Sequence, residues 1–331
     1  MRMGRFLKIL ACLLLLACTV IAVLAWWFLR WDELPPPQLP GVIERGSLEH
    51  DGRRREWLAY IPESVDEKPA LLLLLRGSKH SGEQMRTGSF YSFDRLAEQK
   101  GFIAVYPSGF EGHWNDCRAS ASFSANTLGI DDVGFLRGLT ATLVSLYGAD
   151  PDRVYAAGIS NGGHMAYRLG FEAPELVRGI GAIAANLPVE ESSECKASGE
   201  PVATIIVNGT EDPVNPYPGG VVDLFGDTSR GAVQSAGASV TYWAALAGYS
   251  GDGDKRKWPD QDPGDGTSVH SERWQGVGRL PVELVTVEGE DTVSPTRTIA
   301  APEYWVAPAM NSIRLRFFGP SSSLSTRACT R

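Results

Sequence analysis

Short apolar runs and longer amphipathic segments alternate along most of this chain of 331 residues. Several runs are apolar throughout, as in a parallel sheet covered on both faces. Apolar residues at helical spacing fill the segments between them, and three such segments end in glycine, which is typical of a helix C-terminus. The alternation predicts a doubly wound, mostly parallel α/β sheet. The expected strands are 56–61, 70–75, 102–106, 153–158, 180–185, 203–208 and 282–287, and the three helices are 93–101, 131–148 and 231–248.

The N-terminus departs from this pattern. Basic residues within 1–8 precede an apolar segment, 9–31, that is long enough to cross a bilayer as a helix and ends in tryptophans. We expect a transmembrane anchor at the inner membrane, with residues 1–8 in the cytoplasm and the rest of the chain in the periplasm or extracytoplasmic space. The alternatives are a cleaved signal peptide on a secreted protein and a lipoprotein processed at Cys18.

A proline-rich linker, 32–43, should connect this segment to one α/β domain over 44–319, followed by a tail over 320–331. Within the domain, 248–268 is rich in glycine, aspartate and proline. This composition predicts an exposed loop, and the loop lacks the spacing and the glutamate of an EF-hand calcium site.

The net charge and the cysteine content narrow the expected partners and kinds of site further. The net charge of −8 without a basic stripe argues against a nucleic-acid partner. An exported domain permits one disulfide among Cys117, Cys195 and Cys329, but the sequence does not select the pair. The chain has no C-x-x-C motif, and we expect neither a metal ion nor an organic cofactor.

The strongest chemical motif is Gly158-Ile159-Ser160-Asn161-Gly162, a G-x-S-x-G sequence between an expected strand and a helix-like segment. A sharp strand-to-helix turn needs small flanking residues, and it exposes the serine hydroxyl at the carboxyl edge of the sheet. The motif therefore predicts that Ser160 is a nucleophile. An ordinary glycine-rich turn is the structural alternative.

Two more loops follow strands at the same edge. Asp212 comes after 203–208 and follows Ser160 in the chain order that this type of site requires, although an aspartate before proline is also common in plain turns. Ser78 follows strand 70–75. The backbone N–H groups of Ser78 and Asn161 are the expected donors of an oxyanion hole.

Residues 54–295 resemble the secreted esterase family of poly(3-hydroxybutyrate) depolymerases and feruloyl or acetylxylan esterases. The blocks that carry this resemblance are RGSKHSGEQM, FDRLAEQKGFIAVYPSG, HWNDCR, DDVGFLRGL, DRVYAAGISNGGHMAYRL and VNGTEDPVNPYPGG. The resemblance implies an α/β-hydrolase fold, Ser160 as nucleophile, Asp212 as triad acid, and a small or polymeric ester as substrate.

The chain departs from the family where its catalytic histidine belongs. A G-G-G-H-T-W-P-like block corresponds to VTVEGEDTVSP at 285–295, and Asp291 stands in the place of the histidine. A carboxylate with an ordinary pKa near 4 is a weak base for this task. His270 follows Asp212 in chain order and is the first candidate for a relocated base, and His80 is the second.

Three hypotheses follow: an esterase with a relocated base, an enzyme that uses Asp291 or a water, and a pseudoenzyme that binds a ligand or partner at the membrane. Arg76 replaces the histidine of the family's L-H-G motif, so it could bind an anionic group of a substrate or pair with a carboxylate. Trp114 and Tyr217 are candidate walls of a substrate cleft, or ordinary packing residues.

Overall fold

The computed structural model describes residues 35–224, 226–260, 264 and 266–289, together with Lys8, Leu15, Cys18 and Thr19. The chain divides into two units, 1–37 and 38–331. Most of the expected anchor lies outside the described residues, as do Glu290, Asp291, Cys329 and the tail. Among the described residues, no helix has both the length and the apolar character needed to cross a bilayer.

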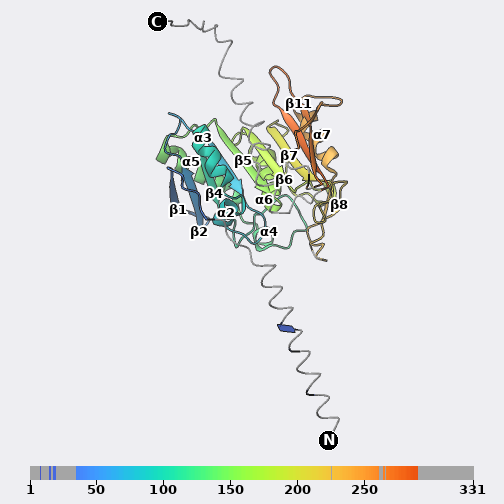
Figure 1. Cartoon of the computed structure of the whole chain (residues 1–331), viewed down its shortest axis with the longest axis horizontal. Helices are drawn as coiled ribbons and strands as arrows, with labels where there is room; N and C mark the ends of the chain where they lie inside the picture. Colours follow the sequence, from blue (N-terminus) through green and yellow to red (C-terminus); the bar gives the residue numbers. More distant parts are fainter. Residues whose placement is uncertain are drawn as a thin grey trace. The chain divides into compact units, whose positions relative to one another are not determined.

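The second unit is built on a ten-stranded sheet, with β1 at one edge and β10, beyond β11, at the other (Figure 1). The strand order is β1-β2-β4-β3-β5-β6-β7-β12-β11-β10, and the six strands from β4 to β12 run parallel. All seven expected strands are present. The strands are β1 (Val42–His50), β2 (Arg53–Ile61), β3 (Leu71–Leu75), β4 (Ile103–Pro107), β5 (Val154–Ile159), β6 (Gly179–Ile183), β7 (Ala203–Gly209), β10 (Asp254–Lys257), β11 (Ser268–Trp274) and β12 (Val282–Glu288).

Helices cover both faces of the sheet, as the uninterrupted leucines of β3 require. Leu71, Leu73 and Leu75 pack in a core with α5, α6 and α7, whereas Leu72 and Leu74 pack in a second core with α2 and α3. Side chains on a strand alternate between faces, so an all-apolar strand needs two apolar surroundings. The helices are α2 (Gly82–Gly88), α3 (Ser92–Lys100), α4 (Ser124–Thr127), α5 (Asp132–Tyr147), α6 (Asn161–Glu172) and α7 (Ala236–Leu246).

The helix expected over 231–248 starts later than its pattern predicts. Residues 232–233 form the short strand β9 (Ala232–Val233), which pairs with β8 (Gly220–Val221). Ser235 then caps α7, because its hydroxyl accepts a hydrogen bond from the N–H of Ala238. A side-chain cap satisfies a free N–H of the first helical turn and so sets the boundary.

The segment expected to be an exposed loop over 248–268 also contains a strand. Its β10 residues pair antiparallel with β11, and all four are exposed. Periodicity does not reveal this strand, because the charged side chains of an edge strand can point to solvent on both faces. The exposure expected for this region is confirmed for β10.

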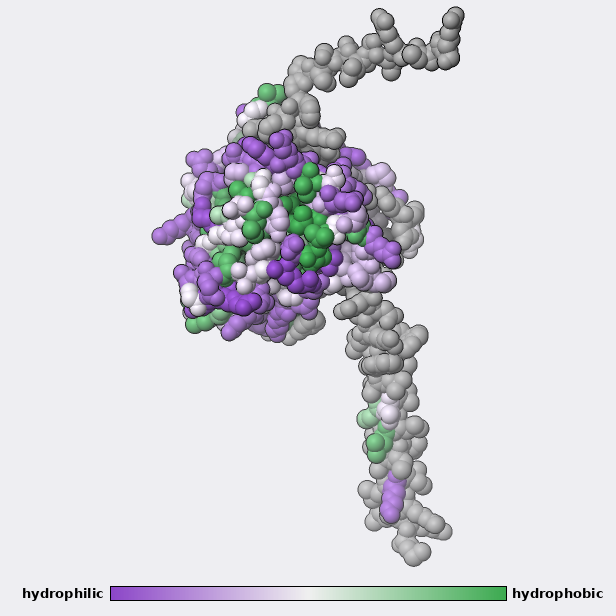
Figure 2. All heavy atoms as spheres, turned by 90° about the vertical axis from the view of Figure 1, so that its left-hand side faces the viewer, coloured by the Kyte–Doolittle hydropathy of each residue, from purple (hydrophilic) through white to green (hydrophobic). Residues whose placement is uncertain are grey.

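Apolar residues also gather on part of the surface, within a polar surrounding (Figure 2). One face of the sheet carries a shallow apolar groove, lined by residues that include Leu72, Tyr155, Ala157, Ile183 and Ile205. These residues lie along the strands and not beyond their carboxyl ends. One of them, Ile183, ends β6, and its carbonyl accepts from the N–H of Ser160.

Candidate active site

Ser160 occupies a strained turn between β5 and α6. Its φ of 54° and ψ of −119° lie outside the regions that side chains favour. A Cβ on Gly158 would lie 2.2 Å from the carbonyl carbon of Gly162, and one on Gly162 would lie 2.0 Å from the carbonyl oxygen of Leu75. Both glycines are therefore required for this turn. The Ser160 N–H donates to the Ile183 carbonyl at 2.8 Å, and this bond joins the turn to β6.

The loop after β3 approaches this serine closely. A Cβ on Gly77 would lie 3.3 Å from the Cβ of Ser160, so the backbone of Gly77 passes beside the nucleophile. Ser78 follows and is half-buried. The N–H of Asn161 lies in the first turn of α6, where helix geometry provides no acceptor within the helix. Two loops distant in sequence thus bring backbone donors to the vicinity of Ser160.

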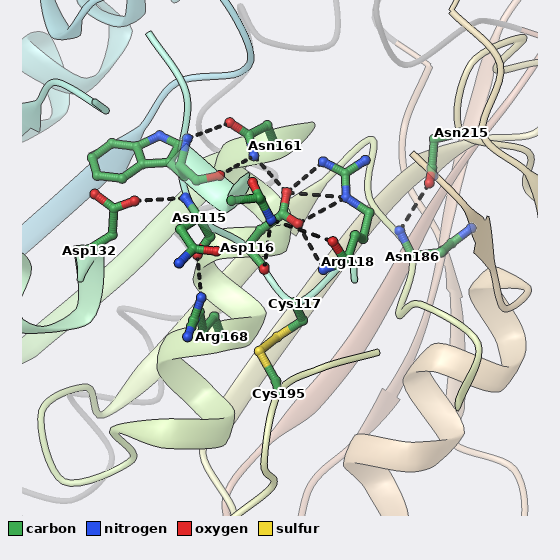
Figure 3. Close-up of polar contacts among 12 residues, drawn as sticks. Asn115, Asp116, Cys117, Arg118, Asp132, Asn161, Arg168, Asn186, Cys195 and Asn215 are labelled. Atoms are coloured by element: carbon green, nitrogen blue, oxygen red, sulfur yellow. Dashed lines mark hydrogen bonds and ion pairs between the residues drawn. A yellow bond between two sulfur atoms is a disulfide. The ribbon is translucent and has the colours of Figure 1, made fainter. Parts of the chain in front are cut away.

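The side chain of Asn161 is fully buried and bonded on both of its polar atoms (Figure 3). Its Oδ1 accepts from the N–H of Trp114 at 2.8 Å. Its Nδ2 donates to the carbonyl of Trp114 at 3.0 Å and to the Asp116 carboxylate at 2.6 Å. These bonds therefore connect the HWNDCR block to the first residue of α6.

Asp116 and Arg118 form a buried ion pair in this block. The guanidinium donates to the carboxylate from Nη2 at 2.5 Å and from Nε at 3.1 Å. Burial raises the pKa of Asp116, but the charge and hydrogen bonds of Arg118 outweigh it and hold this pKa below its ordinary value. His164, one turn into α6, is also buried. Burial, together with the charge of Arg118, lowers the pKa of His164 to about 3, so its imidazole is neutral at pH 7.

The same block contacts several surrounding elements. The indole Nε1 of Trp114 donates to the carbonyl of Arg76 at 2.9 Å. The N–H of Asn115 donates to the Asp132 carboxylate at 2.7 Å, and Arg168 donates to the carbonyl of Asn115 at 2.9 Å. The first bond connects the block to the end of β3. The other two connect it to α5 and to α6 (Figure 3).

The structure selects one disulfide, between Cys117 and Cys195. Cys117 lies between the two members of the buried ion pair, and the bond connects it to the loop after β6. The N–H of Glu194 also donates to the carbonyl of Cys117 at 2.9 Å. The disulfide therefore braces the HWNDCR block from a part of the chain that is 78 residues away in sequence.

Asp212 lies in the loop after β7, at the same carboxyl edge as Ser160. It is buried, and its Oδ1 accepts from the N–H groups of Val214 and Asn215, each at 2.8 Å. The Oδ1 of Asn215 in turn accepts from the N–H of Asn186, after β6, at 3.2 Å. The strand order β5-β6-β7 places the two loops two strands apart, about 10 Å.

The described histidines do not form hydrogen bonds with the hydroxyl of Ser160. His270 is an exposed residue of β11, and its Nδ1 lies 3.7 Å from the carboxylate of Glu288. Its strand is four steps from β5 in the sheet, which corresponds to about 19 Å. The structure therefore does not bring His270 to Ser160, because the antiparallel β11 lies beyond β12.

His80 is closer in the fold, since it belongs to the loop that passes Ser160. Its Nδ1 is 2.6 Å from the carbonyl oxygen of Ser78. Burial, together with the charge of Arg76, lowers the pKa of His80 below its ordinary value. His80 is thus neutral near pH 7 and has the protonation state that a proton acceptor requires.

Two of the expected substrate-binding residues take part in packing and hydrogen bonding within the domain. Trp114 is 1 % exposed, so its ring does not offer a surface to a substrate. Tyr217 is half-buried, and its hydroxyl makes a 2.8 Å hydrogen bond with Thr286 of β12. Both rings act in the structure as packing and hydrogen-bonding groups, which was the alternative for each.

Arg76 has a different environment. It is half-buried, and its Nε is shielded from solvent without a hydrogen-bond partner among the described residues. Burial lowers the pKa of its guanidinium. None of the carboxylates in the described part of the chain forms an ion pair with it, and its position directly precedes Gly77. The guanidinium lies against Gly88 at the end of α2, with Nη1 3.5 Å from the position that a Cβ on this glycine would take, and its charge acts on His80.

One cluster has the composition of a cation site. Ligand atoms of His50, Asp51 and Asp131 lie within 4.8 Å of one another. The carboxylate of Asp131 already accepts from the N–H of Gly134 as the cap of α5, and it lies 3.0 Å from His50. These contacts account for the cluster as a surface helix cap, at the end of β1 and four strands from β5 in the sheet.

Sequence reasoning missed the part that Asp116, Arg118 and the Asn161 side chain play. The motif indicated only the backbone N–H of Asn161. The available signal was the HWNDCR block itself. An acidic and a basic residue separated by one position in an otherwise buried segment indicate a local ion pair.

The comparisons with known proteins agree with this geometry. No family model matches the chain. It is 24% identical over 298 residues to feruloyl esterase B of Talaromyces funiculosus, with 82% of this chain and 81% of that protein covered. It is 34% identical over 136 residues to poly(3-hydroxybutyrate) depolymerase of Ralstonia pickettii, covering 38% of this chain and 27% of that protein.

NocK of Nocardia uniformis, whose name gives esterase as its expected class, is 33% identical over 159 residues. That match covers 47% of this chain and only 44% of NocK. Among solved structures, an acetyl xylan esterase from Aspergillus awamori superposes with a TM-score of 0.56 at 15% identity, covering 80% of this chain and 98% of that one. These findings confirm the resemblance to this group of esterases, and they confirm the α/β-hydrolase fold.

Proposed function

We propose that this chain hydrolyses esters through an acyl-enzyme on Ser160. The observation that carries the proposal is the strained turn of Ser160, whose hydroxyl is not used to cap the helix that it starts. Strain of this kind persists only where the surroundings enforce it, and it is typical of nucleophiles. The named activities of the related proteins support the same reaction class.

In this mechanism the Ser160 oxygen attacks the ester carbonyl, and its proton passes to a base. The N–H groups of Ser78 and Asn161 stabilise the oxyanion, the alcohol leaves, and water then releases the acid from the serine. Asp212 fills the place of the triad acid. His80 is the better placed of the two histidine candidates for the base, because its loop also carries Ser78.

The test is hydrolysis of p-nitrophenyl acetate and butyrate by the full-length chain. Ser160→Ala should abolish turnover, whereas Ser198→Ala, a change at an exposed serine, should leave it unchanged. His80→Ala and His270→Ala then identify the base. Because the pKa of His80 is lowered, a rate that depends on it should persist below pH 6.5 and fall only at more acidic pH. Turnover that survives in Ser160→Ala contradicts the proposal.

A second candidate function is ligand binding without catalysis. It is favoured by the presence of Asp291 where the family has histidine, and by the lack of a histidine bonded to Ser160 among the described residues. Loss of one triad member leaves only a small part of the rate. A folded wild-type chain with no more turnover than Ser160→Ala would support this candidate.

We further propose that Arg76 binds an anionic group of the substrate. The support is its positive charge, which acts on His80 in the loop that carries Ser78, and its unpartnered Nε. The matched pair of substrates is 4-nitrophenyl hydrogen succinate and 4-nitrophenyl butyrate, which differ in one carboxylate. Arg76→Gln should lower kcat/KM for the succinate about tenfold, the size of one exposed charge-assisted contact, and spare the butyrate. An equal loss on both substrates would contradict this role.

The expected membrane anchor over 9–31 is part of the same proposal, with the domain outside the cytoplasm. Its support is the length of the apolar segment and the preceding basic residues. Mass spectrometry of the chain from isolated membranes provides the test. An intact N-terminus supports an anchor, whereas cleavage within the segment or a lipid on Cys18 supports one of the two alternatives.

A further inference from the structure

One segment contacts both sides of the oxyanion hole. We call residues Trp114–Arg118 the brace. The two expected donors, Ser78 and Asn161, belong to loops that follow different strands, β3 and β5, and the distance between the donors decides how well an oxyanion fits. The brace makes hydrogen bonds to each of these loops.

On the Asn161 side, the contact involves the main chain of the brace. The N–H and the carbonyl of Trp114 both bond to the Asn161 carboxamide, at 2.8 and 3.0 Å, and the Asp116 carboxylate accepts a third bond at 2.6 Å. Because this carboxamide is fully buried, alternative rotamers would leave buried polar atoms without partners. The first residue of α6 is thereby held in one orientation relative to the brace.

On the Ser78 side, the contact is a single side-chain bond. The indole N–H of Trp114 donates to the carbonyl of Arg76 at 2.9 Å. That oxygen shares a rigid peptide plane with the N–H of Gly77, so the bond sets the direction in which the chain enters the Gly77-Ser78 turn. The backbone of Gly77 in this turn lies beside the Cβ of Ser160.

The brace is stiffened by an internal ion pair and is fixed to its surroundings by hydrogen bonds and a disulfide (Figure 3). Asp116 is paired with Arg118, Asn115 bonds to Asp132 and Arg168, and the disulfide joins the segment to the loop after β6. Because packed interiors deform little, a segment held in this way fixes the position of one neighbour relative to the other.

We infer that Trp114 is a positioning residue for the oxyanion hole: its main chain holds Asn161, and its indole N–H holds the loop that carries Ser78, so that this one residue sets the distance between the two donors. The inference rests on the proposed function. It assigns Trp114 a role in transition-state stabilisation, instead of the expected role as a wall of the substrate cleft.

The closing experiment compares Trp114→Phe with Trp243→Phe in the full-length chain. Both tryptophans are 1 % exposed, but the indole nitrogen of Trp243 has no hydrogen-bond partner among the described residues. Each change leaves a similar cavity, and only Trp114→Phe also removes a bond to the oxyanion loop. We expect kcat to fall about 10- to 100-fold in Trp114→Phe with KM unchanged, and to stay near wild type in Trp243→Phe.

A second readout separates positioning from general damage. Phenylboronic acid forms a tetrahedral adduct with an active-site serine, so its inhibition constant should rise in parallel with the loss of kcat in Trp114→Phe. The inhibition constant of the product acid, butyrate, should not change. Equal losses of kcat in the two variants, or a weaker binding of butyrate to the same extent as boronate, would overturn the inference.

Failure of the proposed function gives a different result. A wild-type chain without Ser160-dependent turnover overturns the proposed function, and the inference falls with it. Turnover that depends on Ser160 but is unchanged by Trp114→Phe overturns the inference alone.

Discussion

The two sides of the candidate active site differ in how completely they are held. On the oxyanion side, the Asn161 carboxamide makes three hydrogen bonds to a buried segment that also carries an ion pair and a disulfide. On the proton-transfer side, Asp212 accepts two backbone hydrogen bonds, but the described histidines lie elsewhere. Among the described residues, the structure thus shows a strained serine with the backbone of a neighbouring loop beside it, but no histidine hydrogen-bonded to that serine.

This difference has a physical explanation. The oxyanion side depends on many contacts within the core, and the loss of one of them costs folding stability as well as activity. By the resemblance, the proton-transfer side of the family depends on one histidine, at the position that Asp291 occupies in this chain. The chemistry can therefore be lost or relocated while the fold remains intact.

The largest expected effect comes from restoring the imidazole. By the resemblance, position 291 is that of the family's histidine, so in a chain that also carries His80→Ala, Asp291→His should raise kcat for p-nitrophenyl butyrate by about 10²- to 10⁴-fold, the usual contribution of general base catalysis. Glu290→His, one residue away, is the matched control and should have no such effect. A rise that persists after Ser160→Ala would show that the new histidine acts without the proposed nucleophile.

The second prediction tests whether Asp212 acts together with the new histidine at position 291. In the Asp291→His chain, Asp212→Asn should cancel most of the gain in kcat, because an amide cannot stabilise an imidazolium. Glu211→Gln changes the neighbouring exposed acid and should preserve the gain. Comparable kcat values for the two double variants would remove Asp212 from the mechanism.

The third prediction concerns the disulfide of the oxyanion side. Cys117→Ser together with Cys195→Ser should lower the free energy of unfolding by about 2–5 kcal/mol, as for other native disulfides. Denaturant unfolding of the oxidised protein measures the change, with Cys18→Ser as the control. A stability equal to that of the wild type would show that the brace does not need this covalent link.

The fourth and smallest effect is the pH dependence contributed by His164. Its pKa is about 3 in the folded chain, held there by burial and by Arg118 despite the nearby Asp116, whereas an unfolded histidine has an ordinary pKa of about 6.5. The unfolded state therefore binds more protons between these values, so this contribution to stability is complete above pH 6.5 and is lost as the pH falls towards 3.

His164→Gln should accordingly flatten the decrease in unfolding free energy between pH 7 and pH 4, by an amount on the order of a few kcal/mol. Denaturant unfolding at several pH values provides the measurement. His270→Gln, at an exposed position, is the control. If the two variants and the wild type show the same slope, His164 does not contribute to the acid sensitivity of the fold.

The local features of this protein could be predicted from its sequence. Apolar runs predicted the seven core strands, and a strand such as β3 with five consecutive leucines needs apolar surroundings on both faces. Gly158, Ser160 and Gly162 predicted the sharp turn, because only glycine leaves room for the backbone contacts that the structure shows there. These features depend on neighbours in the chain, and so local chemistry reveals them.

Contacts between groups far apart in the sequence could not be predicted and followed from the packing of the domain. Spacing could not pair Cys117 with Cys195, place Asp116 against Asn161, or move Trp114 from a cleft wall to the interior. The position of His270 likewise followed from the order of β7, β12 and β11 in the sheet, although its place in the chain suited a catalytic base. Such contacts depend on how strands and loops far apart in sequence pack together, and that packing is a property of the whole domain rather than of any segment.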